Sequence, residues 1–270
     1  MANGLSLLMP ALEPFVMKAV RAGAALSGVE AGLRTRALSF VHQEGAHQQA
    51  HRDFNRGLTA QVPVLRHIEW AQRRMFRFFE DHGSTRSMLA HAAGAEAVAF
   101  FTARWVDRQR HSLLGDASGP VATMFVWHLA EEVEHKDVAF DLYLASGGGR
   151  ARYFLGIISA LMIFALSVLA TSAVLVVRER QWWRPAVHVR MLWWSLSFVF
   201  EVLPLLGLCL LEDHHPDRWS DPDWLGQWLS VYDRQGGDAP AWNRDTLDGV
   251  WAHDPINASA AAVKTILTAV

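Results

Sequence analysis

Cysteine is nearly absent from the sequence, because Cys209 is the single one among 270 residues. One cysteine excludes an internal disulfide framework and any cysteine-based zinc cluster. An excess of charge of one sign is also lacking, since the net charge is −2 and the isoelectric point is about 6.7. Without a basic excess we expect no nucleic-acid partner. The opening stretch, MANGLSLLMP, lacks the charged and long apolar segments of a secretory signal peptide, so none is expected.

Strand-like alternation of apolar and polar residues is scarce, whereas apolar residues recur at intervals of three and four. This periodicity predicts an all-α fold, divided into helices by segments that contain glycine and proline. The predicted helices cover residues 10–26, 29–56, 64–81, 86–112, 120–145, 152–178, 188–211 and 222–232. We predict a helical bundle in residues 1–146, an apolar helical pair with a following short helix in 147–233, and a C-terminal tail in 234–270.

Charge is concentrated in one otherwise apolar segment, WHLAEEVEHKDVAFDLY, at residues 127–143. On a helix that turns about 100° per residue, His128, Glu132 and His135 project within about 60° of one another. Imidazole and carboxylate groups that converge from successive turns are suited to coordinating a metal ion. The alternative is a solvated stripe, in which Glu132 pairs with Lys136 one turn later.

A second helix repeats this pattern in the segment FVHQEGAHQQAHRDFN, where Glu44, His47 and His51 share one face. The spacing Glu-x-x-His occurs in both segments. Di-metal four-helix bundles use two such pairs and add one carboxylate from each remaining helix. Glu13 and Glu96 are the candidates for these additional carboxylates. Glu96 is the only carboxylate in a long uncharged stretch, and burying it is costly unless it is paired or bound to a metal.

These residues together form a predicted two-metal site. The predicted ligands are Glu13, Glu44, His47, Glu96, His128, Glu132 and His135. Three neighbours, His51, Glu131 and Asp137, are expected to orient the ligands or to act as alternative ligands. The other histidines, His91 among them, follow no ligand spacing and are treated as incidental. A structural protein is the rival from a different class, and its carboxylates would face solvent rather than converge.

Three motifs carry a resemblance to a known family: ExFVxxxVR at residues 13–21, QExxHxxxHxxxN at 43–55 and WHxxEExEHKxVAFDLY at 127–143. The stretch 10–143 resembles the bacterial family of predicted metal-dependent hydrolases, and the motif WLxxY at 228–232 extends this resemblance. The resemblance implies a ferritin-like helical bundle with a di-metal centre. The family's usual position for the third-helix glutamate holds Ala99 here, and Glu96 lies one turn earlier on a similar face.

The spacing His-x-x-x-Glu-x-x-His also resembles the p-aminobenzoate N-oxygenase class of di-iron proteins, with His128 as the third histidine. This resemblance implies two iron ions, with manganese or a mixed pair as alternatives, and O2 as a partner. From it we predict a di-iron oxygenase, an oxidoreductase that activates O2 to oxidise a small, lipophilic organic substrate. The alternatives are a metal-dependent hydrolase that uses a metal-activated water, and a non-catalytic metal-binding or membrane helical protein.

Residues 153–177 contain no charge and have arginines on both sides. This length is enough to cross a hydrocarbon core about 30 Å thick. The following stretch, RERQWWRP, has the basic and aromatic residues typical of a membrane interface. A second apolar run, 191–211, is interrupted by Glu201 and Pro204.

These two apolar segments predict association with a membrane. We expect the protein at the cytoplasmic face of the membrane or integral in the inner membrane. The alternative is that both helices are buried against the bundle or in a homodimer interface, which would place the protein in the cytoplasm.

Overall fold

The computed structural model describes residues 2–114, 119–211 and 213–234, and within these ranges it confirms the all-α fold. The predicted tail, from residue 235 onward, lies outside the described residues. The helices are α1 (Ala2–Ala24), α2 (Ala31–Gln61), α3 (Leu65–His82), α4 (Thr85–Leu114), α5 (Gly119–His135), α6 (Val138–Ala145), α7 (Arg150–Arg178), α8 (Pro185–Leu208) and α9 (Asp223–Arg234), with a short 3-10 turn at Pro216–Arg218.

Several boundaries differ from the predicted helices by a few residues, and two differences change the description of the fold. The first helix begins at Ala2 rather than near residue 10, since Pro10 lies inside it. The predicted helix 120–145 is two helices, because α5 ends at His135 and α6 begins at Val138. The interruption falls at Asp137, whose carboxylate forms an ion pair with Arg36 of α2. This partner lies about a hundred residues away in the sequence, so local periodicity gives no sign of the break.

The described residues group into two compact units. The first contains Met1–Phe101 and His135–Trp219, and the second contains Thr102–Glu134 and the segment from Ser220. The first unit therefore holds α1 to α3, the first half of α4, and α6 to α8. The predicted functional division at residues 146 and 233 stays a prediction.

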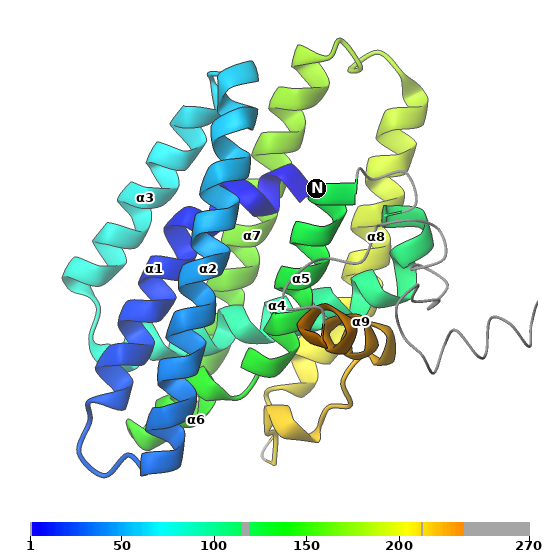
Figure 1. The fold of residues 1–270 in the computed structure, drawn as a ribbon. Coiled ribbons are helices and arrows are strands. Elements are labelled where there is room, and N and C mark those ends of the chain that lie inside the picture. Colours follow the sequence, from blue (N-terminus) through cyan, green and yellow to red (C-terminus); the bar gives the residue numbers. More distant parts are fainter. Residues whose placement is uncertain (1, 115–118, 212, 235–270) are drawn as a thin grey trace, which may run out of the picture. The chain divides into compact units, whose positions relative to one another are not determined.

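Helix α1 is the central element of the first unit, where it packs against α2, α3, α6 and α7 (Figure 1). Its large apolar side chains are buried, with Leu7 and Phe15 each 1% exposed. Phe15 packs against Phe76 of α3, with ring centroids 5.2 Å apart. Burial of these side chains removes apolar area from water and holds α1 in place.

Glycines allow α7 to approach its neighbours closely. A Cβ atom on Gly156 would lie 2.0 Å from the carbonyl oxygen of Ala90 in α4, and one on Gly94 would lie 2.4 Å from the Gly156 backbone. A Cβ atom on Gly4 of α1 would lie 2.6 Å from the Val168 backbone. These positions leave no room for a side chain, so α7 is fixed against α4 and α1 by backbone contact.

The buried face of α2 is polar rather than apolar. Its buried residues include Glu44, His47, His51, Asn55 and Thr59, at successive spacings of three and four. A helix normally buries apolar residues at these positions, because an uncompensated polar group is costly in the interior. This polar stripe is therefore where a functional site is expected.

Helices α7 and α8 are long and apolar enough to cross a membrane, by length and composition. Only 22% of the most apolar stretch of α7 and 17% of that of α8 is buried within the protein. Exposed apolar residues on α7 include Leu155, Ile158, Met162, Leu166 and Leu169. That these helices associate with a membrane stays a prediction.

Candidate metal centre

Two overlapping sets of buried carboxylates and imidazoles lie in the first unit. Ligand atoms of Glu44, Glu96 and His135 lie within 4.8 Å of one another, as do those of Glu13, Glu44 and His47. All five residues are at most 4% exposed. Helix α2 supplies the two residues at 44 and 47, while α1, α4 and the end of α5 each supply one. Glu44 belongs to both sets, which is the arrangement of a carboxylate shared between two cations.

The contact between Glu44 and His135 tests directly whether these residues fit a metal ion. His135 Nε2 lies 3.1 Å from the side-chain oxygen of Gln43, and an amide oxygen only accepts, so Nε2 donates its proton there. His135 Nδ1 is therefore an acceptor, and it lies 2.9 Å from Glu44 Oε1. Neither of these two atoms makes a hydrogen bond within the described part of the chain. Two buried lone pairs at this distance repel each other unless a proton or a metal cation lies between them.

The electrostatics of Glu44 agree with a ligand role. Burial by itself raises the pKa of this carboxyl group, but the nearby imidazoles of His135 and His47 lower it by more. The net pKa of Glu44 lies well below its ordinary value. The group is therefore a carboxylate at neutral pH, which is the form that coordinates a metal ion.

His51 is held by a network that begins with a proline. Pro10 has no backbone N–H, so the carbonyl of Ser6 loses its helical partner. The Asn55 side chain donates to this carbonyl at 2.7 Å, and Ser6 Oγ donates to Asn55 Oδ1 at 2.7 Å. Ser6 Oγ lies 2.8 Å from His51 Nδ1, and since its own proton goes to Asn55 it accepts there. The Nε2 atom of His51 is thus left as an acceptor, which is the state of a ligand.

A ligand atom of His51 lies within 4.8 Å of one from Glu13. The sequence treats His51 as an orienting residue or an alternative ligand. Its tautomer and its distance to Glu13 favour the second of these roles.

The remaining predicted ligands, His128 and Glu132, belong to the second unit. His128 Nε2 lies 2.9 Å from Glu132 Oε1, and each residue is 5% exposed. Glu131 is half-buried and accepts a hydrogen bond from Trp127 Nε1 at 2.9 Å. Glu131 is therefore held by its own helix, whereas Glu132 is paired with an imidazole on the buried face.

Asp137 does not contact a ligand histidine in the way the sequence suggests. Its carboxylate pairs with Arg36, and the same guanidinium binds Asp141. Arg36 thereby ties the start of α6 to α2 immediately after His135. The role of orienting His135 falls to Gln43 instead.

Sequence reasoning missed Gln43, Ser6 and Asn55 as supporting residues. Gln43 and Asn55 lie within the motif QExxHxxxHxxxN, so the motif itself is the signal that could have identified them. Ser6 lies before the first predicted helix and follows no ligand spacing. Its role depends on the proline four residues later.

A buried group of glutamates and histidines on facing helices is the kind of ligand set that di-metal helical bundles use. The family comparison agrees, because the family model of predicted metal-dependent hydrolases matches residues 1–219. The chain belongs to this family. No curated protein and no solved structure matches the chain.

Family membership settles the predicted enzyme class at a coarse level. It supports a metal-dependent enzyme and confirms the family resemblance carried by the sequence motifs. The prediction of an O2-activating di-iron oxygenase is wrong, because the family is one of hydrolases. The hydrolase, given as the alternative, is the function that the family supports.

Proposed function

We propose that the protein is a hydrolase whose two-metal centre is held by Glu13, Glu44, His47, Glu96 and His135. The observation that carries the proposal is the buried 2.9 Å approach of His135 Nδ1 to Glu44 Oε1, within a group of glutamates and histidines whose ligand atoms converge. His128 and Glu132 stay predicted ligands from the sequence alone, on their helical spacing from His135 along α5.

The protein groups have distinct tasks in this proposal. Glu44 would belong to both ligand sets, while Gln43 and Ser6 fix the rings of His135 and His51 in the tautomers that present a lone pair. Divalent cations held by these residues would supply the chemistry, because such an ion lowers the pKa of a water molecule enough to make a nucleophile near pH 7. Hydrolysis adds that water across the substrate bond and transfers no electrons, so neither O2 nor a reductant is consumed.

Iron or manganese is the proposed metal. The ligand set contains carboxylates and imidazoles and no thiolate, and both metals accept such mixed ligands. The proposed substrate is a small lipophilic molecule with a hydrolysable bond, because the apolar surface of α7 and α8 would give such molecules access from a lipid phase.

We also propose that α7 and α8 associate with a lipid bilayer. Their exposed apolar faces are flanked by a connecting segment that contains Arg178, Arg180 and Arg184. Trp182 and Trp183 in this segment are 62% and 61% exposed. Exposed tryptophans beside arginines favour the boundary between lipid headgroups and acyl chains. The proposed location is therefore the cytoplasmic side of the membrane or the membrane itself.

The first test measures metal content and hydrolysis together. Full-length protein, extracted in detergent after growth with iron and manganese, is expected to hold about two metal ions per chain. It should hydrolyse p-nitrophenyl esters or phosphates, and a chelator should abolish the activity until metal is restored. Glu44→Gln should lower the metal content to one ion or fewer, because it removes the shared carboxylate.

Glu134→Gln is the matched control, since Glu134 is an exposed carboxylate on α5. This variant should keep both metal ions and full activity. Wild-type protein that binds no metal, or a Glu44→Gln variant with full occupancy, would disprove the proposed centre. Two bound metal ions without hydrolysis of any tested ester or phosphate would disprove the proposed hydrolase function and indicate a metal-binding protein.

A further inference from the structure

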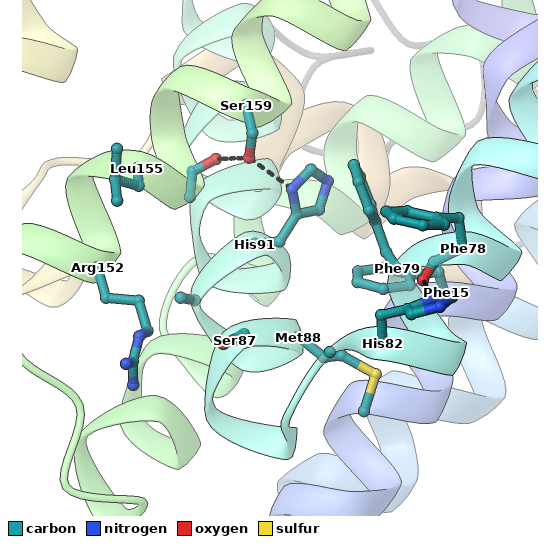
Figure 2. A pocket seen from close by; sticks show the side chains of 13 residues that line it. Phe15, Phe78, Phe79, His82, Ser87, Met88, His91, Arg152, Leu155 and Ser159 are labelled. Atoms are coloured by element: carbon teal, nitrogen blue, oxygen red, sulfur yellow. Dashed lines mark hydrogen bonds between the residues drawn. The ribbon is translucent and has the colours of Figure 1, made fainter.

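A second site lies in the first unit, in a cavity of about 450 Å³ among α1, α3, α4 and α7 (Figure 2). Phe15, Phe79, Met88 and Leu155 supply much of its lining. A cavity of this size and apolar character is typical of binding sites for small organic molecules. The lining also contains the polar residues His82, Ser87, Arg152 and Ser159, and His91 is its buried histidine.

The protonation of His91 follows from its contacts. The residue is 6% exposed, and its Nδ1 atom lies 2.7 Å from Ser159 Oγ. Ser159 donates its own proton to the carbonyl of Gly156 at 2.9 Å, so it accepts from His91 Nδ1–H. The Nε2 atom therefore carries a lone pair. Within the described residues this atom has no hydrogen-bond partner.

The surroundings of His91 keep the ring neutral. The edges and faces of Phe15 and Phe79 approach it with centroid distances of 5.3 and 5.7 Å. Burial among these rings lowers the pKa of His91 to about 4. A neutral imidazole with a lone pair does not attract anions, but it accepts a hydrogen bond from an O–H or N–H group.

This cavity is separate from the metal centre. On α1, Phe15 follows Glu13 by two residues, which places the two side chains about 160° apart around the helix. On α4, His91 precedes Glu96 by five residues, and the two project about 140° apart. The cavity thus lies on the faces of α1 and α4 that point away from the proposed ligands.

We propose that this cavity binds a small apolar molecule with a hydroxyl group, most simply a phenol, whose O–H donates to His91 Nε2. The aromatic lining accommodates the body of the molecule. The hydroxyl reaches Nε2 once a neighbouring phenylalanine ring shifts, because this unpartnered acceptor has almost no exposed surface. Figure 2 shows the second ring nitrogen of His91 pointing toward the phenylalanine side of the cavity, away from Ser159. Nothing in this proposal depends on a metal ion.

The test compares 2-naphthol with naphthalene, which has the same rings and no hydroxyl. Equilibrium dialysis against full-length protein in dodecyl maltoside, corrected with protein-free micelles, gives both affinities. Wild-type protein should bind 2-naphthol roughly five- to tenfold more tightly than naphthalene, the effect of one net hydrogen bond. His91→Leu should reduce this ratio to about one and still bind naphthalene. Ser159→Ala should lower the ratio as well, because the ring proton is then free to move to Nε2.

Leu155→Trp tests the position of the site, because this exposed side chain lines the cavity. It should weaken both ligands at least fivefold, while Leu166→Trp, an equally exposed site on the same helix outside the cavity lining, should weaken neither. An equal 2-naphthol preference in wild type, His91→Leu and Ser159→Ala would overturn the proposal. So would unchanged binding in Leu155→Trp. Metal content should be the same in all these variants, so the binding result tests the cavity separately from the proposed hydrolase function.

Discussion

At the scale of single residues, the proposed metal centre depends on which nitrogen of His135 carries its proton. Gln43 decides this, since its side-chain oxygen accepts from Nε2 and leaves Nδ1 beside Glu44. Substitution of a residue that orients a ligand in this way commonly lowers metal affinity by ten- to a hundredfold.

Gln43→Ala should therefore weaken metal binding about tenfold or more and leave the helix content unchanged. Competition with a metal-sensitive dye measures the affinity. Gln49→Ala is the control on the same helix, since Gln49 is exposed and donates to Asp53. Equal metal affinity in the two variants would show that Gln43 has no part in holding His135.

His91 makes the stability of the protein depend on pH. Burial lowers its pKa from 6.5 to about 4, so between these values the unfolded chain binds a proton that the folded chain does not. The contribution of His91 is complete above pH 6.5 and is lost as the pH falls toward 4. The difference amounts to about 3 kcal/mol at the acid end.

His91→Leu should accordingly lose less stability than wild type between pH 7 and pH 4.5, by a margin of about 2–3 kcal/mol. Urea unfolding at both pH values measures it, and other titrating groups cancel in the comparison. His67→Leu, at an exposed histidine on α3, should follow the wild-type profile. Parallel profiles for wild type and His91→Leu would rule out a buried neutral imidazole.

At the scale of elements, the prolines of α1 determine how it joins α2. Pro10 leaves the Ser6 carbonyl without its helical donor, and Asn55 replaces that donor from the neighbouring helix. The same amide group holds Ser6 Oγ, which in turn fixes His51. The hydrogen bond that α1 lacks at Pro10 is thus replaced by side-chain hydrogen bonds between α1 and α2.

A double-mutant cycle tests this connection. Asn55→Ala alone should lower the free energy of unfolding by roughly 1–3 kcal/mol, because it leaves a buried carbonyl unsatisfied. In the background of Pro10→Ala, where a backbone N–H is restored at this position, the same change should cost about 1 kcal/mol less. Chemical denaturation of the four proteins gives the coupling energy. Strict additivity would mean that Pro10 and Asn55 act independently.

At the scale of the whole molecule, the exposed apolar surface of α7 and α8 is expected to be shielded from water by a lipid bilayer. Full-length protein should float with vesicles that contain anionic lipid, and Trp182→Ser with Trp183→Ser should reduce the bound fraction severalfold. Phe78→Ser is the control, because Phe78 is 58% exposed on α3, away from this segment. A detergent-free homodimer that remains unbound to vesicles would show that a second copy of the chain covers these helices instead.

Much of the fold could be predicted from the sequence, because helical periodicity and chain breaks are local signals. Helical spacing and the two additional carboxylates also selected a set of residues whose ligand atoms lie in two overlapping buried groups, namely Glu13, Glu44, His47, Glu96 and His135. That they bind a metal ion stays a prediction. The rest depends on distant partners that periodicity does not contain. Arg36 pairs with Asp137 at the break after His135, and Gln43 rather than Asp137 contacts the His135 ring.

His91 is a residue whose proposed role could not be predicted from the sequence. It follows no ligand spacing, so the sequence marks it as incidental. Its lone pair becomes significant only because Ser159 and Gly156 of α7 lie beside it, where the absence of a side chain at Gly156 allows α4 and α7 to touch. A close approach of two backbones is a property of the folded chain, and no local sequence pattern predicts it.

The break between α5 and α6 brings the ends of two helix dipoles together. The C-terminal end of α5 at His135 lies only three residues before the start of α6 at Val138. A helix has a partial negative charge at its C-terminus and a partial positive charge at its N-terminus, so the two ends largely cancel at this junction. The charge of Glu44 is therefore balanced by the neighbouring imidazoles rather than by the peptide groups of α5.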